Sequence, residues 1–183
     1  VPVLTRPNNN KNLFMSSLGP KFGITDVSWS GAFPVILRWM WEHYADKRIV
    51  KEHYDTSKRF VDGLRAQANE LLNSTLASFY VWGDWCSNQS REIATAGSGP
   101  PAAAFNFILS LDAMVALATV LEKEEDVKLY SELSSQARHA WHQSFYNRQH
   151  GLYGYDARDG FALQTLTSAP LAMEDVIPED LLS

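Results

Sequence analysis

Hydrophobic and polar residues along the chain predict five helices of two alternating types. Residues 33–44 and 102–121 are apolar on nearly every side of a helix, which is typical of helices buried all round. Residues 51–72 and 124–145 instead carry one apolar stripe among charged neighbours, as peripheral amphipathic helices do. Residues 163–173 are again mostly apolar. The predicted order is therefore inner, outer, inner, outer, inner.

The pattern also sets the expected boundaries of the helical part. Residues 1–25 are rich in Pro, Asn, Gly and Ser and show no sustained period, so we expect an irregular lead-in segment. Residues 26–183 are expected to form one helical domain. Pro170 should kink the fifth helix or end it early, because proline lacks the amide donor that a helix interior needs. We expect no strands apart from short loop pieces such as residues 79–82.

Alternating buried and half-buried helices predict an all-α fold and are what part of an (α/α)6 toroid requires. In such a ring each inner helix contacts its neighbours and an outer helix, while the outer helices keep one wet face. A generic helical bundle also mixes the two kinds of helix. Periodicity alone leaves both architectures open.

Composition narrows the classes of function. The chain has 183 residues, of which 45% are hydrophobic, so it can bury a sizeable core. Its net charge of -5 and the lack of a Lys/Arg cluster argue against a nucleic-acid partner. A single Cys excludes an internal disulfide framework and a multi-Cys metal site. The longest apolar stretch, 101–121, is interrupted by Asn106, Ser110 and Asp112, so we expect no membrane span.

The first residues lack an initiator Met and a signal pattern, so the start reads as an interior cut of a longer protein. Two glycan-acceptor triplets, at 73–75 and 88–90, matter only if the protein is secreted, and the location stays open.

Unusual residues gather in the segments that lead into the three inner helices. If these helices point the same way, the three segments share one face of the molecule. Aromatic rings fit the C–H faces of a sugar, carboxylates accept its hydroxyl hydrogen bonds and glycines allow close approach, so this mixture suits a carbohydrate. The residues are Asp26, Ser28, Trp29 and Gly31; then Trp82, Gly83, Asp84, Trp85 and Asn88; then His150, Tyr153, Gly154, Tyr155, Asp156, Asp159 and Gly160.

The connections at the opposite end, residues 45–48 and 123–126, are short, charged and free of aromatics. The competing interpretation of the aromatic segments is that Trp29, Trp82 and Trp85 are core residues, which is the usual fate of tryptophan.

Other candidate sites have weaker support. His139 and His142 lie three residues apart on a predicted helix, but no third ligand is spaced to complete a zinc pattern, so we expect solvated helix residues. Cys86 has no base near it in the sequence and is not expected to be a nucleophile. Phosphate-binding glycine motifs and nucleophile elbows are absent from the sequence. We therefore expect neither a metal nor a cofactor.

From Asp26 onward the chain resembles the α-L-rhamnosidases of glycoside hydrolase family 78. Residues 29–36 are similar to the family's Trp-x-x-Ala segment, and 41–49 to a helix that ends in Tyr-Gly-Asp-x-x-Ile, with Ala45 in place of the Gly. Further likenesses follow in order along the chain: residues 53–64, Gly83-Asp84-Trp85, residues 137–147, Gln164-Thr165 and residues 176–179.

The resemblance implies an (α/α)6 toroid and an inverting hydrolase that removes terminal α-L-rhamnose with one Glu as general acid and another as general base. Neither Glu matches a residue of this chain. The residues that carry over are Trp29 and Trp85, which match aromatics lining the sugar pocket, and Asp84 beside them. Many relatives have an acidic residue where this chain has Gly31, which removes a sugar-hydroxyl contact at that point.

Five helices are fewer than the twelve of a closed toroid, so the resemblance implies a fragment that is inactive alone. Its expected partners are a rhamnose-containing glycoside and the remainder of its own catalytic domain. Two alternatives stay open. One is another toroid glycosidase, trehalase-like or glucoamylase-like, in which Asp84 or Asp26 would serve as acid or base. The other is a non-catalytic helical carbohydrate-binding module.

Overall fold

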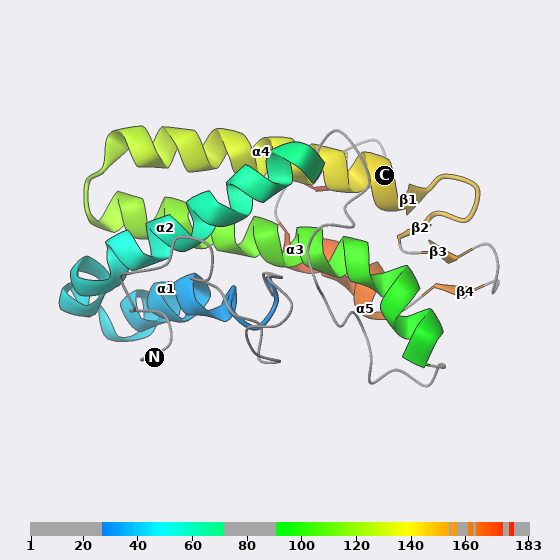
Figure 1. Cartoon of the computed structure of the whole chain (residues 1–183), viewed down its shortest axis with the longest axis horizontal. Helices are drawn as coiled ribbons and strands as arrows, with labels where there is room; N and C mark the ends of the chain where they lie inside the picture. The colour runs from blue at the N-terminus through cyan, green and yellow to red at the C-terminus, as the bar shows by residue number, and fades with distance from the viewer. Residues whose placement is uncertain are drawn as a thin grey trace.

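The computed structural model describes residues 27–71, 91–153, 155–156, 161–162, 164–173 and 176–177 (Figure 1). The helices are α1 (Ala32–Tyr44), α2 (Lys47–Leu71), α3 (Arg91–Val120), α4 (Glu124–Phe145), the short α5 (Gln164–Ser168) and the 3-10 helix η2 (Ala169–Ala172). Four two-residue strands form two antiparallel pairs: β1 (Tyr146–Asn147) with β2 (Leu152–Tyr153), and β3 (Tyr155–Asp156) with β4 (Phe161–Ala162).

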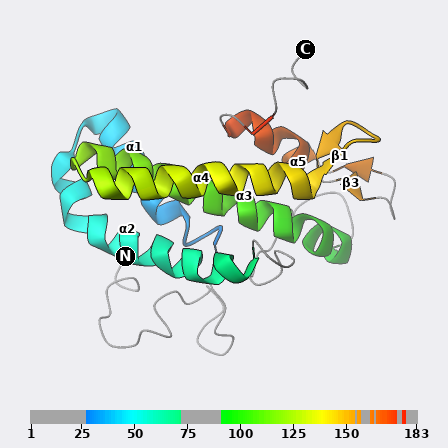
Figure 2. The ribbon, with the colours of Figure 1, turned by 90° about the horizontal axis from the view of Figure 1, so that it is seen from above.

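Helix α3 occupies the centre of the structure and packs against α1, α2 and α4 (Figures 1 and 2). Helices α1, α3 and α5 run in one direction and α2 and α4 return, so the chain forms two helical hairpins followed by a third inner helix. This is the predicted alternation of inner and outer helices.

The core lies along α3, as its all-round apolar pattern predicts. Ile108, Leu111, Met114 and Leu117 are completely buried. Within the described residues, Pro101–Val120 is the one helix long and apolar enough to cross a membrane by length and composition, and 56% of its apolar window is buried inside the protein. Its apolar faces are occupied largely by the neighbouring helices.

The two outer helices meet along a polar seam beside the core. Asp126 of α4 accepts hydrogen bonds from Lys58 Nζ at 2.6 Å and from Tyr54 Oη at 2.7 Å. Tyr130 Oη donates to Asp62 at 2.9 Å. Burial and the neighbouring carboxylates raise the pKa of Tyr54 and of Tyr130 well above the ordinary value, so both remain neutral hydrogen-bond donors. The single apolar stripes predicted for these helices are confirmed where burial is described: the inward positions of α2 as far as Leu64 and those of α4 are buried or half-buried.

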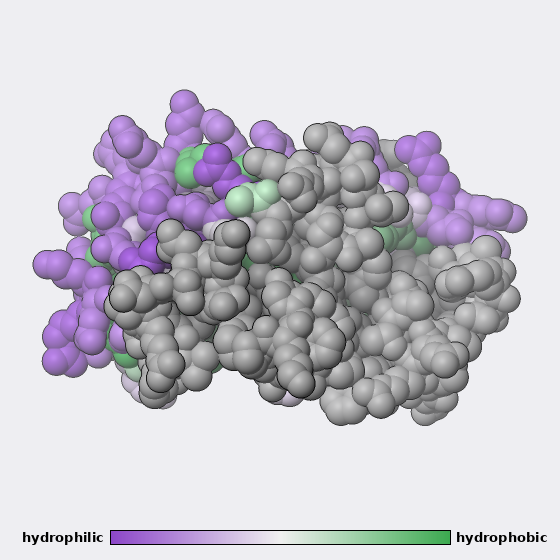
Figure 3. All heavy atoms as spheres, in the orientation of Figure 1, coloured by the Kyte–Doolittle hydropathy of each residue, from purple (hydrophilic) through white to green (hydrophobic). Residues whose placement is uncertain are grey.

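Short turns connect the helices of each hairpin at one end of the molecule. Helix α1 ends at Ala45, whose φ of 51° is left-handed, and Asp46 then accepts hydrogen bonds from the backbone amides of Arg48 and Ile49 at the start of α2. Lys47 pairs with Glu122 at 3.6 Å, so the α1–α2 turn and the α3–α4 turn lie side by side. Figure 3 shows hydrophilic residues gathered over this end and along α4.

One prediction for the inner helices was wrong. Helix α1 is not buried all round: Ile36 and Trp39 are 49% and 54% exposed. Pro34 and Leu37 are buried on its other side. The exposed residues face away from α2 and α3, and none of the described elements covers them.

The start of α3, the exposure of the last helix and the short strands also need comparison with the prediction. Helix α3 begins at Arg91, eleven residues before Ala102, because the helical backbone continues through Pro100 and Pro101 despite their missing amide donors. The fifth helix changes to 3-10 geometry at Ala169, next to Pro170, as predicted, but Leu171 is exposed. The β1–β2 and β3–β4 pairs were not predicted, because two-residue strands are too short to show a period.

Candidate functional site

Helices α1, α3 and α5 all begin on the side away from the charged turns (Figures 1 and 2). The start of α3 and the β-strands before α5 lie at the far end of the molecule, whereas the turn before α1 lies nearer the middle, beside Ser110 of α3. The second predicted segment, residues 82–88, lies outside the described residues, so the expectation that all three segments share one face stays a prediction. We refer to the side on which α1, α3 and α5 begin as the loop end.

Trp29 lies at the loop end in the turn formed by residues 27–31. Its indole is 63% exposed, so Trp29 is not a core residue in this structure. Val27 anchors the turn in the core, and its carbonyl oxygen accepts a hydrogen bond from the Gly31 amide at 3.1 Å. The turn thus presents an aromatic face outward from a fixed base.

Gly31 fits this turn because no larger residue has room there. A Cβ at this position would lie 2.1 Å from the Val27 carbonyl oxygen and 3.2 Å from Ser110 Oγ on α3. An acidic side chain at residue 31 would therefore require the turn to move. The short distance to the Val27 carbonyl therefore explains why residue 31 is a glycine. From the sequence alone, Gly31 was only a departure from the family pattern.

Asp84 and Trp85, the other two predicted substrate-binding residues, lie outside the described residues, as do Trp82 and Cys86. That Trp29 and Trp85 face the same sugar stays a prediction.

Strands β1 and β2 form a hairpin that is held against α4 by an aromatic cluster of Trp141, His142, Tyr146 and Tyr153. The ring of Tyr153 stacks on Trp141 with centroids 4.8 Å apart, and its Oη shares a 2.7 Å hydrogen bond with His142 Nδ1. Trp141 Nε1 donates to the Pro101 carbonyl of α3 at 3.0 Å. Burial raises the pKa of Tyr153 to about 12, so this hydroxyl stays protonated at physiological pH.

The same cluster joins the hairpin to the next inner helix, because Thr167 Oγ1 of α5 donates to the Tyr153 carbonyl at 3.4 Å. Gly151, with a φ of 66°, closes the turn between β1 and β2. The sequence analysis did not predict this cluster. The feature that could have indicated it is the spacing of Trp141, His142 and Tyr146 at the end of an amphipathic helix.

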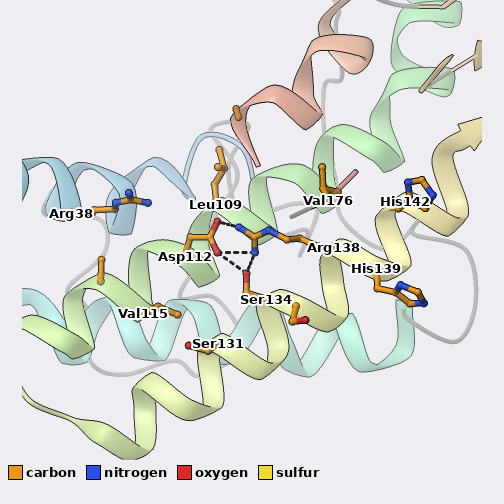
Figure 4. Close-up of a pocket in the computed structure, with 13 residues that line it drawn as sticks. Arg38, Leu109, Asp112, Val115, Ser131, Ser134, Arg138, His139, His142 and Val176 are labelled. Carbon is orange, nitrogen blue, oxygen red and sulfur yellow. Dashed lines mark hydrogen bonds and ion pairs between the residues drawn. The ribbon is translucent and has the colours of Figure 1, made fainter. Parts of the chain in front are cut away.

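A cavity of about 730 Å³ lies beside α3 and α4, with Arg38 of α1 and Ala172 and Val176 at its edges (Figure 4). Among the lining residues, Arg138 forms a bidentate ion pair with Asp112: Nη1 lies 3.0 Å from Oδ1 and Nη2 lies 2.6 Å from Oδ2. Ser134 Oγ donates to the same carboxylate at 2.6 Å. Arg138 also donates to Ser134.

Among the described residues that line this cavity, Asp112 is the one carboxylate, and Arg138 and Ser134 make three donor contacts to its two oxygens. Inverting glycoside hydrolysis needs two carboxyl groups roughly 6.5–9.5 Å apart, one of them protonated. The described lining of the cavity therefore offers one carboxyl group and not the pair that this chemistry needs, and Asp112 links α3 to α4.

The two histidines on α4 each form a hydrogen bond with a neighbouring side chain. His139 Nε2 is hydrogen-bonded to Gln143 at 2.8 Å, and His142 to Tyr153. Within the part of the chain that the structure describes, no group of three or more His, Cys, Asp or Glu residues is placed to hold a metal ion.

The inner helices run parallel, the outer helices return between them, and the inner helices begin on one side, the loop end. These features define the α/α hairpin class of proteins, to which the toroid glycosidases belong. A family model described as the bacterial alpha-L-rhamnosidase 6 hairpin glycosidase domain matches residues 8–182, and the chain belongs to this family. The resemblance noted in the sequence and the toroid-fragment fold are thereby confirmed.

Among solved structures, the chain is similar to an α-L-rhamnosidase from Dictyoglumus thermophilum, with 29% sequence identity and a TM-score of 0.68. The match covers 85% of this chain and 16% of that chain, so the present sequence spans a small part of its solved relative. No curated protein sequence matches.

Proposed function

We propose that this chain is part of the catalytic domain of an enzyme that removes terminal α-L-rhamnose, and that its loop end forms part of the sugar site. The observation that carries the proposal is the family match together with the shared direction of α1, α3 and α5, which all begin on the side away from the charged turns. A ring of parallel inner helices brings the segments that lead into them together around one opening, where several can contact one ligand.

In this proposal the chain supplies binding groups. Trp29 and Trp85 stack on the C–H faces of the sugar, and Asp84 accepts hydrogen bonds from its hydroxyls. The exposed indole of Trp29 supports the first contact. The acid and base belong to other parts of the enzyme: a protonated carboxyl donates to the leaving oxygen, and a carboxylate activates water on the opposite face of the sugar.

The test uses the whole protein that contains this chain, with an aryl α-L-rhamnoside as substrate. W29A and W85A should each lower kcat/KM by about 5- to 150-fold, which corresponds to an aromatic contact worth about 1–3 kcal/mol. Y44A is the matched control, because Tyr44 is an exposed aromatic at the opposite end of α1 and its loss should leave kcat/KM unchanged.

Three results would contradict the proposal in whole or in part. Cleavage of trehalose or an α-glucoside without cleavage of the rhamnoside would assign the domain to another toroid glycosidase. Binding of rhamnose without product formation would assign it to a carbohydrate-binding module. Reduced thermal stability of W29A and W85A with unchanged kcat/KM would show that these residues are structural.

A further inference from the structure

The aromatic cluster at the end of α4 lies where α3, the β1–β2 hairpin and α5 meet. Trp141 is buried and donates from Nε1 to the Pro101 carbonyl of α3 at 3.0 Å. The Tyr153 carbonyl of β2 accepts a hydrogen bond from Thr167 Oγ1 of α5 at 3.4 Å. Because the rings of Trp141 and Tyr153 stack on each other, one cluster connects all three elements to α4.

Tyr153 is the central member of this cluster. Its ring is 5% exposed, and its centroid lies 4.8 Å from that of Trp141, 5.0 Å from that of Tyr146 and 5.7 Å from that of His142. A phenylalanine at this position would keep these ring contacts. The hydroxyl adds one directional contact, the 2.7 Å hydrogen bond to His142 Nδ1. Since a buried polar group is costly to leave unpaired, this bond favours one orientation of the ring, and with it of β2, on α4.

Tyr153 also lies at the base of the next hairpin. Strand β3 begins at Tyr155, two residues after Tyr153, and β4 ends at Ala162, two residues before α5 begins at Gln164. The backbone of the β3–β4 hairpin therefore leaves the cluster at Tyr153 and returns to it through α5, where Thr167 contacts the Tyr153 carbonyl. The two strands and the start of α3 lie at the same end of the molecule (Figures 1 and 2).

Strand β3 consists of Tyr155 and Asp156, an aromatic and a carboxylate residue of the kinds that bind sugars. Resting on the proposed function, we propose that Tyr153 is a positioning residue for the sugar site. Its hydrogen bond to His142 sets where the β3–β4 hairpin stands relative to the start of α3. Tyr153 is too deeply buried to contact the sugar, so its effect passes through the backbone that it holds.

This role has a distinct kinetic consequence. The acid and base of the proposed reaction belong to other parts of the enzyme, so a displaced hairpin weakens the binding of the sugar in the ground state and the transition state alike. A loss of such uniform binding raises KM and leaves kcat nearly unchanged.

The test uses the whole protein that contains this chain and measures kcat and KM for an aryl α-L-rhamnoside. Y153F should raise KM by about fivefold, the factor that corresponds to one neutral hydrogen bond, with little change in kcat. Y130F is the matched control, because Tyr130 is also buried and its hydroxyl donates to Asp62 at 2.9 Å, at the seam between α2 and α4. Y130F should lower thermal stability by a similar amount and leave KM unchanged.

Two variants of His142 test the hydrogen bond from its other side. H142N and H142L both remove the imidazole ring that stacks on Tyr146, but only the asparagine keeps a polar group that can pair with the Tyr153 hydroxyl. H142L should raise KM as Y153F does, and H142N should keep KM near that of the unsubstituted protein.

Four outcomes would overturn the inference. Unchanged KM in Y153F and H142L, in a protein that cleaves the rhamnoside, would overturn it and leave the proposed function standing. Equal rises of KM in Y153F and Y130F, or in H142N and H142L, would show that KM does not depend on this hydrogen bond. Failure of Y153F and H142L to fold would assign the bond a purely structural role. No cleavage by the unsubstituted protein would contradict the proposed function, and this inference with it.

Discussion

Helices α1 and α3 have the same apolar pattern, yet only α3 is buried on nearly all sides. The central helix is enclosed by α1, α2 and α4, and four of its large side chains are fully buried. Helix α1 has neighbours on one side and exposes Ile36 and Trp39 on the other. An apolar sequence pattern therefore does not by itself show which sides of a helix are covered: that depends on the elements packed around it.

The largest expected effect comes from truncating the two helices at equivalent apolar positions. L111A should lower the free energy of unfolding of the 183-residue chain by about 2–5 kcal/mol, because Leu111 is fully buried and its loss leaves a cavity. I36A should cost less than about 1 kcal/mol in the same chain. Urea denaturation measures both values. Equal losses would contradict the difference between the two helices.

A second prediction concerns the seam between α2 and α4, which is closed by polar contacts. D126N should lower the free energy of unfolding by about 1–2 kcal/mol at pH 7, because Lys58 and Tyr54 lose a charged acceptor. E125Q is the matched control, since Glu125 is the exposed neighbour in the same helical turn. Thermal or urea unfolding of both variants provides the comparison.

The effect of D126N should depend on pH. Burial alone would raise the pKa of Asp126, but hydrogen bonds from Lys58 and Tyr54 outweigh it and the pKa lies below the ordinary 3.8. The carboxylate therefore stabilises the fold above that pH, and the contribution is lost as the pH falls through the lowered pKa. The difference between D126N and the unsubstituted chain should vanish in acid. A difference that stays constant from pH 7 to pH 2 would exclude this origin.

A smaller effect is expected at the aromatic cluster of the loop end. Y153F removes the hydrogen bond to His142 and should cost about 1 kcal/mol of unfolding free energy. Y146F is the control, because Tyr146 contacts His142 by ring stacking and keeps its ring. If Y146F costs as much as Y153F, the hydroxyl bond does not hold the hairpin.

The smallest expected effect is a gain in stability. Ala45 adopts a left-handed conformation that glycine adopts without steric cost, so A45G should raise the free energy of unfolding by up to about 1 kcal/mol. A differential scanning experiment detects this as a higher Tm. A lower Tm would mean that the loss of chain entropy at glycine exceeds the relief of strain.

Much of the fold follows from local patterns. The stripes of α2 and α4, the short charged turns and the end at Pro170 depend on residues close together in sequence, and the structure confirms each of them. The continuation of α3 back through Pro101 and Pro100 to Arg91 did not follow, because prolines lack the amide donor of a helix interior and the apolar pattern begins only at Ala102. The exposure of Ile36 and Trp39 on α1 could not be predicted either. The apolar pattern of a helix does not say which neighbouring elements are present.

The candidate site was predictable in part. The position of Trp29 at the loop end followed from the direction of the helices, and its exposure agrees with a binding role. The link between Asp112 and Arg138 was not predicted, because it joins residues 26 positions apart on two helices. Its sequence signal was a lone carboxylate in an apolar helix, which is expected to find a cationic partner when it is half-buried.

The most direct test of the account is a structure of the whole protein with rhamnose bound. The sugar should lie at the loop end, with the rings of Trp29 and Trp85 in van der Waals contact with it, at roughly 4 Å. Rhamnose bound in the cavity beside Asp112 and Arg138, or away from both tryptophans, would contradict the account.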